Sequence, residues 1–117
     1  ARLLEAYSGS CAITGEHTEP VLAAAHIQPY LGPGSNHVQN GLLLTQEFHT
    51  LFDRGYVAVK PDDLTVRVSA RLQRDFGNGR RYAAFDGAEI LHLPGEPRMR
   101  PSHEALEWHW RKVFKAG

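Results

Sequence analysis

Four polar residues interrupt apolar stretches of the chain at spacings that could bring them to one site. His26 ends the run AAAHI, Asn40 opens the step NGLLL, and His49 and Asp53 follow on the next segment. His49 and Asp53 are four residues apart, so on a helix their side chains leave the same face with Cβ atoms about 5–6 Å apart. An imidazole and a carboxylate in that arrangement can bind one divalent cation.

Each of these residues also has an ordinary structural explanation. A His/Asp pair at this spacing is common on solvated helix faces, where it forms only a hydrogen bond. A histidine at a strand end can be a structural residue, and Asn40 alone would fit a turn or a cap. The order and spacing of the four residues together favour a functional site.

The segments around these residues predict two strands that are joined by a loop. Residues 21–27 are continuously apolar between the breakers Pro20 and Pro29, which is typical of a buried strand. Residues 31–39 are rich in glycine and other turn formers and predict a loop, where functional groups often lie. The apolar run 41–44 follows directly.

A helix is predicted immediately after the second apolar run. Thr45 is a suitable N-cap for a helix over 46–53, and Gly55 is suited to end it. The residues that we expect on its buried face are Phe48, Leu51 and Phe52. His49 and Asp53 lie on a different face, so neither has to enter the core.

The rest of the chain predicts a single α+β domain. We expect a helix at 2–7, a strand at 11–13, a hairpin of 56–59 and 65–68, a turn at 77–81, a strand within 83–93 and a helix from the cap Ser102 to about Lys115. The core-facing residues expected in the last helix are Leu106, Trp110, Val113 and Phe114.

Length and composition exclude several classes of protein. A chain of 117 residues with 42% hydrophobic and 22% charged residues is neither a disordered tail nor a coiled coil. No apolar run approaches the roughly 18 residues of a membrane span, so we expect no membrane partner. The single cysteine, Cys11, allows no internal disulfide and fits a reducing cytoplasm. Because the chain begins at Ala1, we expect a domain excised from a longer protein.

Charge is distributed unevenly although its total is zero. Residues 1–53 carry one Arg and five acidic residues, a net of −4, and residues 54–117 carry twelve Lys or Arg and eight acidic residues, a net of +4. The basic half could follow a phosphate backbone, or it could be an ordinary solvated surface. The same two interpretations apply to a group of arginines with aromatic neighbours, namely Arg71, Arg74, Arg80, Arg81, Tyr82 and Phe85.

Several segments resemble one known family. The segments CAITG, AAHIQPY and NGLLLTQEFHTLFDRG look like the HNH endonucleases, in the branch with the signatures AAHI and NGLLL…H..LFD.G. The resemblance covers residues 11–60 and implies a ββα-metal core, in which two antiparallel strands and a helix surround one divalent cation. An added β-hairpin and a C-terminal helix would complete the α+β domain.

The resemblance also implies a role for each polar residue. His26 matches the general base that activates water, and a neutral imidazole with a pKa near 6.5 can accept that proton at pH 7. Asn40 matches the residue that orients this histidine or braces the loop. His49 and Asp53 match metal ligands, with Mg²⁺ expected and Mn²⁺, Ni²⁺ or Zn²⁺ as alternatives. Arg54 could contact the substrate phosphate, or could be a surface residue.

Two departures from the family pattern affect the metal. Many HNH enzymes carry Asp or His directly before the base, where this chain has Ala25. Close relatives often carry an acidic residue two positions before that one, where this chain has Ala23. Two protein ligands would leave the remaining positions to water and phosphate, as Mg²⁺ tolerates. His17 or His37 could fill the gap, or activity could be weak or absent. A paired-CxxC zinc knuckle is excluded, because Thr14 stands where a second cysteine would follow Cys11.

The sequence therefore predicts a metal-dependent endonuclease that hydrolyses DNA, with His26 as base. The resemblance suggests the cleavage domain of a restriction-type enzyme for modified DNA, with a separate DNA-recognition domain. The oligomeric state stays open, although a double-strand break by a domain with one site would call for two copies, as in a homodimer. The alternative is a decayed HNH fold that acts as a DNA-binding or protein-interaction module. His103 and His109 are expected to have packing or surface roles, and His92 is expected to be structural within an apolar strand.

Overall fold

An antiparallel hairpin and the helix that follows it form the centre of the molecule. In the computed structural model, which describes residues 2–29 and 37–117, strand β1 (Leu22–His26) pairs with β2 (Gly41–Thr45), from Leu22 opposite Thr45 to His26 opposite Gly41. Helix α2 (Gln46–Asp53) begins directly after β2, with the predicted bounds. The side chain of Thr45 caps it by accepting the N–H of Phe48 at 3.4 Å.

The apolar face of α2 packs against this hairpin and forms the core. Phe48 and Phe52 are buried, and Leu42 and Leu44 of β2 are fully buried beneath them. Burial of each such side chain contributes roughly 1.5–3 kcal/mol, which fixes the orientation of the opposite face of α2 toward solvent. The predicted loop at 31–39 lies mostly outside the described residues, and its last part, Val38–Asn40, is the 3-10 helix η3.

Two predicted strands differ from the structure. β1 is buried only at Ala25, whereas Ala24 and His26 are exposed, because β1 pairs with β2 alone in a two-stranded sheet of the described chain. The predicted strand at 11–13 is a buried turn. Ala12 there donates its N–H to the carbonyl of Leu43, and its own carbonyl accepts the N–H groups of residues 91 and 92. This one residue thus connects β2 to the segment around residue 91, but the turn does not form a continuous strand.

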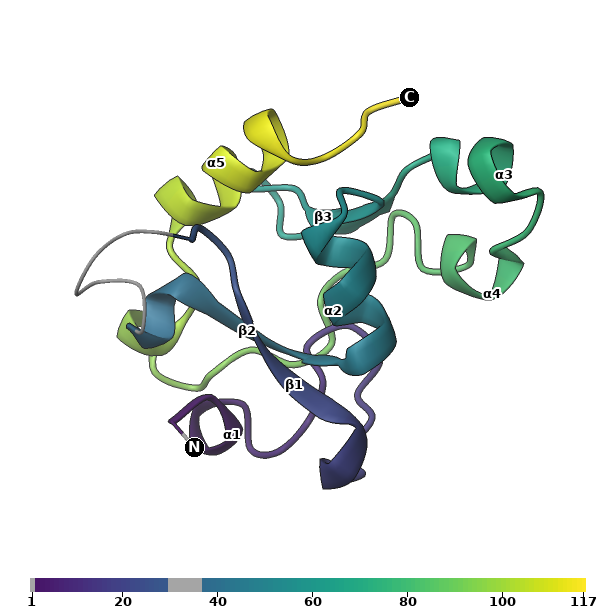
Figure 1. Ribbon diagram of the computed structural model, residues 1–117. Coiled ribbons are helices and arrows are strands. Elements are labelled where there is room, and N and C mark those ends of the chain that lie inside the picture. Colours follow the sequence, from purple (N-terminus) through teal and green to yellow (C-terminus); the bar gives the residue numbers. More distant parts are fainter. Residues whose placement is uncertain (1, 30–36) are drawn as a thin grey trace.

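The remaining elements surround this centre (Figure 1). The predicted hairpin is confirmed as β3 (Val57–Val59) and β4 (Val66–Val68), and the first helix as α1 (Arg2–Ala6), which packs on β2. Two short helices, α3 (Arg71–Phe76) and α4 (Arg80–Ala83), were not expected from the sequence. In place of a strand within 83–93, Glu89 forms an isolated bridge with Thr65. Single 3-10 turns form at η1 (Glu19–Val21) and η4 (Pro97–Met99).

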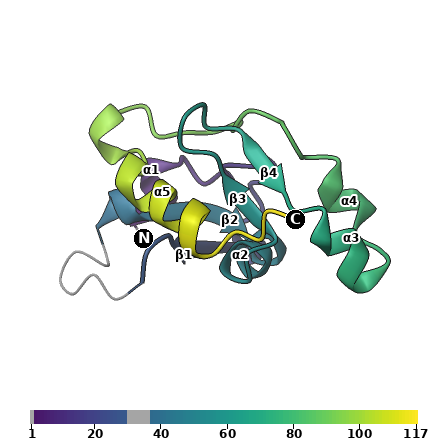
Figure 2. The same ribbon diagram turned by 90° about the horizontal axis from the view of Figure 1, so that it is seen from above.

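The C-terminal helix α5 (His103–Lys112) packs beside β3 and the end of α2. Seen from above, it lies on the side of the molecule away from α3 and α4 (Figure 2). Ser102 caps it as predicted, by accepting the N–H of Ala105 at 2.9 Å. The predicted buried face is confirmed at Leu106 and wrong at Trp110, which is only half-buried. His109, one position earlier, is buried together with Ala105, because His109 faces Phe52. No described helix is both long and apolar enough to cross a membrane.

Candidate active site

His49 and Asp53 project from the solvent side of α2 as one pair. The Nε2 atom of His49 lies 3.1 Å from Oδ2 of Asp53, and the two side chains are 31% and 55% exposed. The pair is thus accessible from outside while its helix is anchored by Phe48 and Phe52 on the opposite face. Spacing along one regular helix suffices to create this arrangement.

The structure brings His26 to the same place from a different element. His26 is the exposed last residue of β1, and it lines a hollow of about 310 Å³ together with His49 and Asp53. We call this the α2–α5 hollow, because helix α5 forms its other wall. Its remaining lining residues are Ile27, Pro29, Trp108, His109 and Val113.

Asn40 lies behind this hollow and holds the chain that leaves His26. Its buried side chain accepts the N–H of Gln28 at 2.9 Å and donates to the Gln28 carbonyl at 2.8 Å. Its own carbonyl accepts the N–H of Ile27 at 2.9 Å. Both residues that follow His26 are therefore bonded to Asn40. This geometry matches a residue that braces the turn of the hairpin.

The other predicted candidates lie in different surroundings. Arg54 is exposed directly after α2. His17 and His37 are exposed outside the α2–α5 hollow as far as the described chain defines it, and the Nδ1 atom of His37 accepts the N–H of Gln39. His92 is exposed rather than part of an apolar strand, so that prediction was wrong. His103 is exposed and forms surface ion pairs when protonated.

His109 is the residue of this hollow whose contacts the sequence did not reveal. Its ring is buried, it stacks on Phe52 at 3.7 Å between centroids, and its Nε2–H donates to the Phe52 carbonyl at 2.7 Å. Burial lowers the pKa of His109 to about 4, so the ring is neutral at physiological pH. Its position three residues after Leu106 on a helix was the available signal for burial.

The residues present fit a divalent cation held by two side chains. Two neighbouring ligands of an octahedral Mg²⁺ lie about 3 Å apart, because each metal–oxygen distance is about 2.1 Å. The 3.1 Å between His49 Nε2 and Asp53 Oδ2 is close to that separation. Within the described residues, no group of three or more His, Cys, Asp or Glu side chains could hold a metal. Ala25 explains part of this, because its side chain is fully buried in the core.

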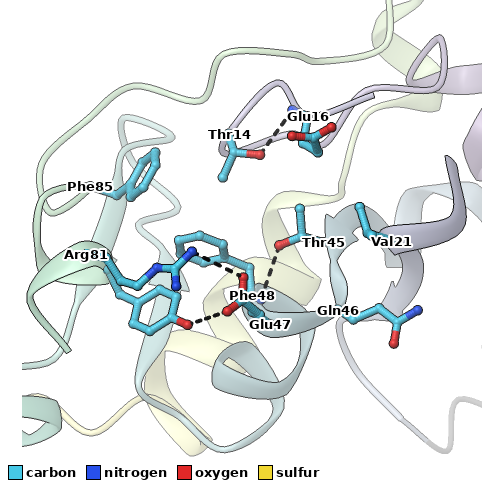
Figure 3. Close-up of a pocket in the computed structure, with 10 residues that line it drawn as sticks. Thr14, Glu16, Val21, Thr45, Gln46, Glu47, Phe48, Arg81 and Phe85 are labelled. Carbon is cyan, nitrogen blue, oxygen red and sulfur yellow. Dashed lines mark hydrogen bonds and ion pairs between the residues drawn. The ribbon is translucent and has the colours of Figure 1, made fainter. Parts of the chain in front are cut away.

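A second and larger hollow lies on the other side of α2 (Figure 3). This α2–α4 hollow has a volume of about 540 Å³, and Phe48, Tyr82 and Phe85 form aromatic walls in it. The Tyr82 hydroxyl donates to Glu47 at 2.6 Å, which raises the pKa of Tyr82. Arg81 lies 4.0 Å from the same carboxylate. The Glu47 carboxylate in this hollow is thus already paired within the protein.

Comparison with known families finds one family that resembles part of the chain. Residues 11–60 match the family model described as HNH endonuclease, and this segment contains His26, Asn40, His49 and Asp53. The match covers less than half of the chain, and it is this segment that is similar to HNH endonucleases. Among its described residues, this segment supplies the β1–β2 hairpin, helix α2, strand β3 and the 3-10 turns η1 and η3.

A solved structure of similar fold gives a more particular comparison. The protein described as "Modification dependent TagI restriction endonuclease" is 21% identical in sequence to this chain and superposes with a TM-score of 0.60. The similarity covers 98% of this chain but only 37% of the other, so this chain spans little more than a third of that protein's length. No curated protein matches the chain in a sequence comparison.

Proposed function

We propose that the α2–α5 hollow hydrolyses DNA phosphodiester bonds with the help of a divalent cation. The observation that carries this proposal is that His26, from β1, and the pair His49–Asp53, from α2, line one accessible hollow. A base on one side and two metal ligands on the other are the groups that metal-assisted hydrolysis needs.

His49 and Asp53 would hold the cation, with Mg²⁺ as the expected ion. When bound, the cation would supply positive charge for the scissile phosphate and for the leaving 3′-oxygen. Water and phosphate would complete the coordination, because the described chain offers two protein ligands here. Arg54, exposed at the end of α2, would add a charge-assisted contact to a neighbouring phosphate.

His26 would act as the general base. A ring nitrogen accepts a proton from water while the water oxygen forms a bond to phosphorus, the bond to the 3′-oxygen breaks, and that oxygen leaves as an alkoxide that takes a proton from solvent. Asn40 would contribute by fixing Ile27 and Gln28, which keeps the end of β1 in place beside α2.

The comparisons and the uneven charge distribution support a proposal about the kind of enzyme to which this site belongs. We propose a modification-dependent restriction enzyme, because the chain has the fold of a larger protein with that description. A separate domain of a longer chain would recognise the DNA, and a second copy would cut the other strand. The basic residues 54–117, with a net charge of +4, would contact the phosphate backbone. We place the enzyme in the cytoplasm.

One observation favours a second candidate, a decayed HNH fold that binds DNA or protein without cutting. The described residues contain no cluster of three metal ligands, and Ala25 occupies a position at which many family members carry one. Such a domain would still bind DNA but would be inert in every metal.

Cleavage of supercoiled plasmid distinguishes the two candidates. We expect nicking in Mg²⁺ or Mn²⁺, none in EDTA, and none from His26→Ala or His49→Ala. The matched control is His103→Ala, which removes an exposed histidine on α5 and should cut normally. Absence of cleavage in every metal, with Mn²⁺ binding that does not depend on His49, would establish the decayed module instead.

A further inference from the structure

The end of α2 that carries Asp53 is held by residues that follow it by more than fifty positions. His109 of α5 stacks flat on the ring of Phe52, with the ring planes 5° apart, and its Nε2–H donates to the Phe52 carbonyl at 2.7 Å. Phe52 is the residue before Asp53, in the last turn of α2. The last carbonyls of a helix lack the regular partner four residues on. The Phe52 carbonyl accepts both the N–H of Gly55 at 3.2 Å and the donor of His109, which ties this turn to α5.

A second contact from the same part of the chain closes on the residues after α2. The N–H of Lys115 donates to the Gly55 carbonyl at 2.8 Å. A Cβ atom on Gly55 would lie 2.2 Å from the carbonyl oxygen of Val113, so the two backbones touch here. The exit of α2 is therefore enclosed by α5 and the residues that follow it.

Packing alone does not account for a histidine at position 109. The ring is 2% exposed, and its Nδ1 atom has no hydrogen-bond partner among the described residues. A buried acceptor without a partner is unfavourable, and a phenylalanine would stack on Phe52 without that cost. What the histidine adds is the N–H that Phe52 accepts. Burial keeps the pKa of His109 near 4, so its protonation does not change at neutral pH.

We propose that His109 is a positioning residue, which fixes the last turn of α2 and thereby the placement of Asp53 relative to His49 and His26. The inference rests on the proposed function, because His49 and Asp53 are the metal ligands named there. His109 lines the same hollow as these three residues but need not touch metal or DNA in this role. Its effect passes through the backbone of Phe52.

Two substitutions separate the two contacts of His109. His109→Phe keeps a ring on Phe52 and removes the donor, whereas His109→Gln keeps a donor near the position of Nε2 and removes the ring. The matched control is Trp110→Phe, since Trp110 stacks on Phe114 rather than on α2. Each variant of the full chain is titrated with Mn²⁺ alone by calorimetry and assayed for kcat and KM on plasmid, and its melting is recorded in parallel.

We expect His109→Phe to lower Mn²⁺ affinity and kcat about tenfold with little change in KM, as is typical when a partner outside the ligand set is lost. His109→Gln should recover part of both, and Trp110→Phe should match the wild type. Amide hydrogen exchange gives a readout that is independent of metal. In His109→Phe the amides of Arg54 and Tyr56, which bond to Thr50 and Leu51, should exchange faster, while those at the start of α2 stay protected.

Several outcomes would overturn this role for His109. Wild-type Mn²⁺ affinity and kcat in a folded His109→Phe, even with a lower melting temperature, would leave His109 a merely structural residue. If His109→Phe fails to fold, His109→Gln carries the test. A kcat well below the wild-type value, together with wild-type amide exchange at the end of α2, would show that the loss of activity does not come from this turn. Failure of the proposed site itself looks different, because His49→Ala would then bind Mn²⁺ as tightly as the wild type.

Discussion

The two sides of helix α2 carry similar residues with different degrees of internal pairing. On the α2–α4 side, Glu47 receives a hydrogen bond from Tyr82 and an ion pair from Arg81. On the α2–α5 side, His49 and Asp53 are paired with each other and face a hollow that also contains His26. The α2–α4 side uses the charge of Glu47 to attach α4, whereas the α2–α5 side gathers two imidazoles and a carboxylate around one hollow.

The difference shows that volume is a poor guide to chemistry in this molecule. The α2–α4 hollow, at about 540 Å³, is larger than the α2–α5 hollow at about 310 Å³. Aromatic rings form part of its wall, and its Glu47 carboxylate already has partners. The smaller hollow combines three groups able to bind metal or move protons from two elements. The function of a hollow depends on which polar groups remain available.

The largest expected contrast between the two sides is in cleavage. His49→Ala should reduce metal-dependent plasmid nicking by more than about 100-fold, because even partners outside a ligand set cost 10–100-fold. Glu47→Ala, two residues earlier on α2, should change nicking by less than about twofold. Initial rates at saturating Mg²⁺ measure both. Equal losses in the two variants would mean that the functional side of α2 is wrongly identified.

The pH dependence of stability should also be specific to the α5 side. The folded pKa of His109, about 4, is below the ordinary 6.5, so between these values the unfolded chain binds a proton that the folded chain does not. The free energy of unfolding should therefore fall by up to about 3 kcal/mol from this group as pH decreases from about 6.5 to 4, and stay constant above 6.5.

Urea unfolding of the wild type and of His109→Phe at several pH values measures this contribution. The difference in the free energy of unfolding between the two proteins should change with pH. His26, His49 and Asp53 are present in both, so they cancel from this difference and His109 remains. Parallel plots of the free energy of unfolding against pH would show that folding does not lower the pKa of His109.

Two glycines compare the enclosed exit of α2 with the open end of α3. Gly55 and Gly77 both have positive φ, at 82° and 63°, so alanine is strained at either position. Only Gly55 touches a neighbouring backbone, at Val113, whereas a Cβ on Gly77 meets nothing within 4 Å. We expect Gly55→Ala to cost at least about 2 kcal/mol and Gly77→Ala about 1 kcal/mol. Chemical unfolding measures both, and a larger loss at Gly77 would contradict the enclosure by α5.

The smallest expected effect concerns the attachment of α4. Tyr82→Phe removes a hydrogen bond to an exposed carboxylate but keeps the ring on Phe48. The loss of stability should be about 0.5 kcal/mol or less, because solvent replaces such contacts. Nicking should stay at the wild-type rate. A clear loss of cleavage would show that the α4 side takes part in catalysis.

Local patterns predicted the bounds of α2 and the proximity of His49 and Asp53 along it. Thr45, the apolar period of Phe48 and Phe52, and Gly55 define the helix without reference to the rest of the chain, so its bounds agree with the structure. The spacing of His49 and Asp53 then places them together. That His26 joins them follows from the pairing of β1 with β2, which the resemblance to HNH endonucleases supplied.

Features that depend on distant contacts were not predicted. The helices α3 and α4 have six and four residues, too short for a clear apolar period. The face of α5 was shifted by one position because a histidine between two tryptophans does not look apolar, and only its contact with Phe52 explains its burial. The exposure of β1 likewise depends on the absence of a second strand partner in the described chain.

The bracing of Gln28 by Asn40 has a consequence for chemical ageing. Asn40 precedes Gly41, whose Cα has no room for a side chain because Leu3 lies against it. An asparagine before glycine is prone to deamidation: the glycine nitrogen attacks the side-chain carbonyl, ammonia leaves, and water then opens the resulting succinimide to an aspartate. In the folded chain both ends of the Asn40 amide are bonded to Gln28, which keeps the carbonyl out of reach. Unfolded protein should therefore deamidate at Asn40 faster than folded protein in peptide maps, and the aspartate formed could no longer donate to Gln28.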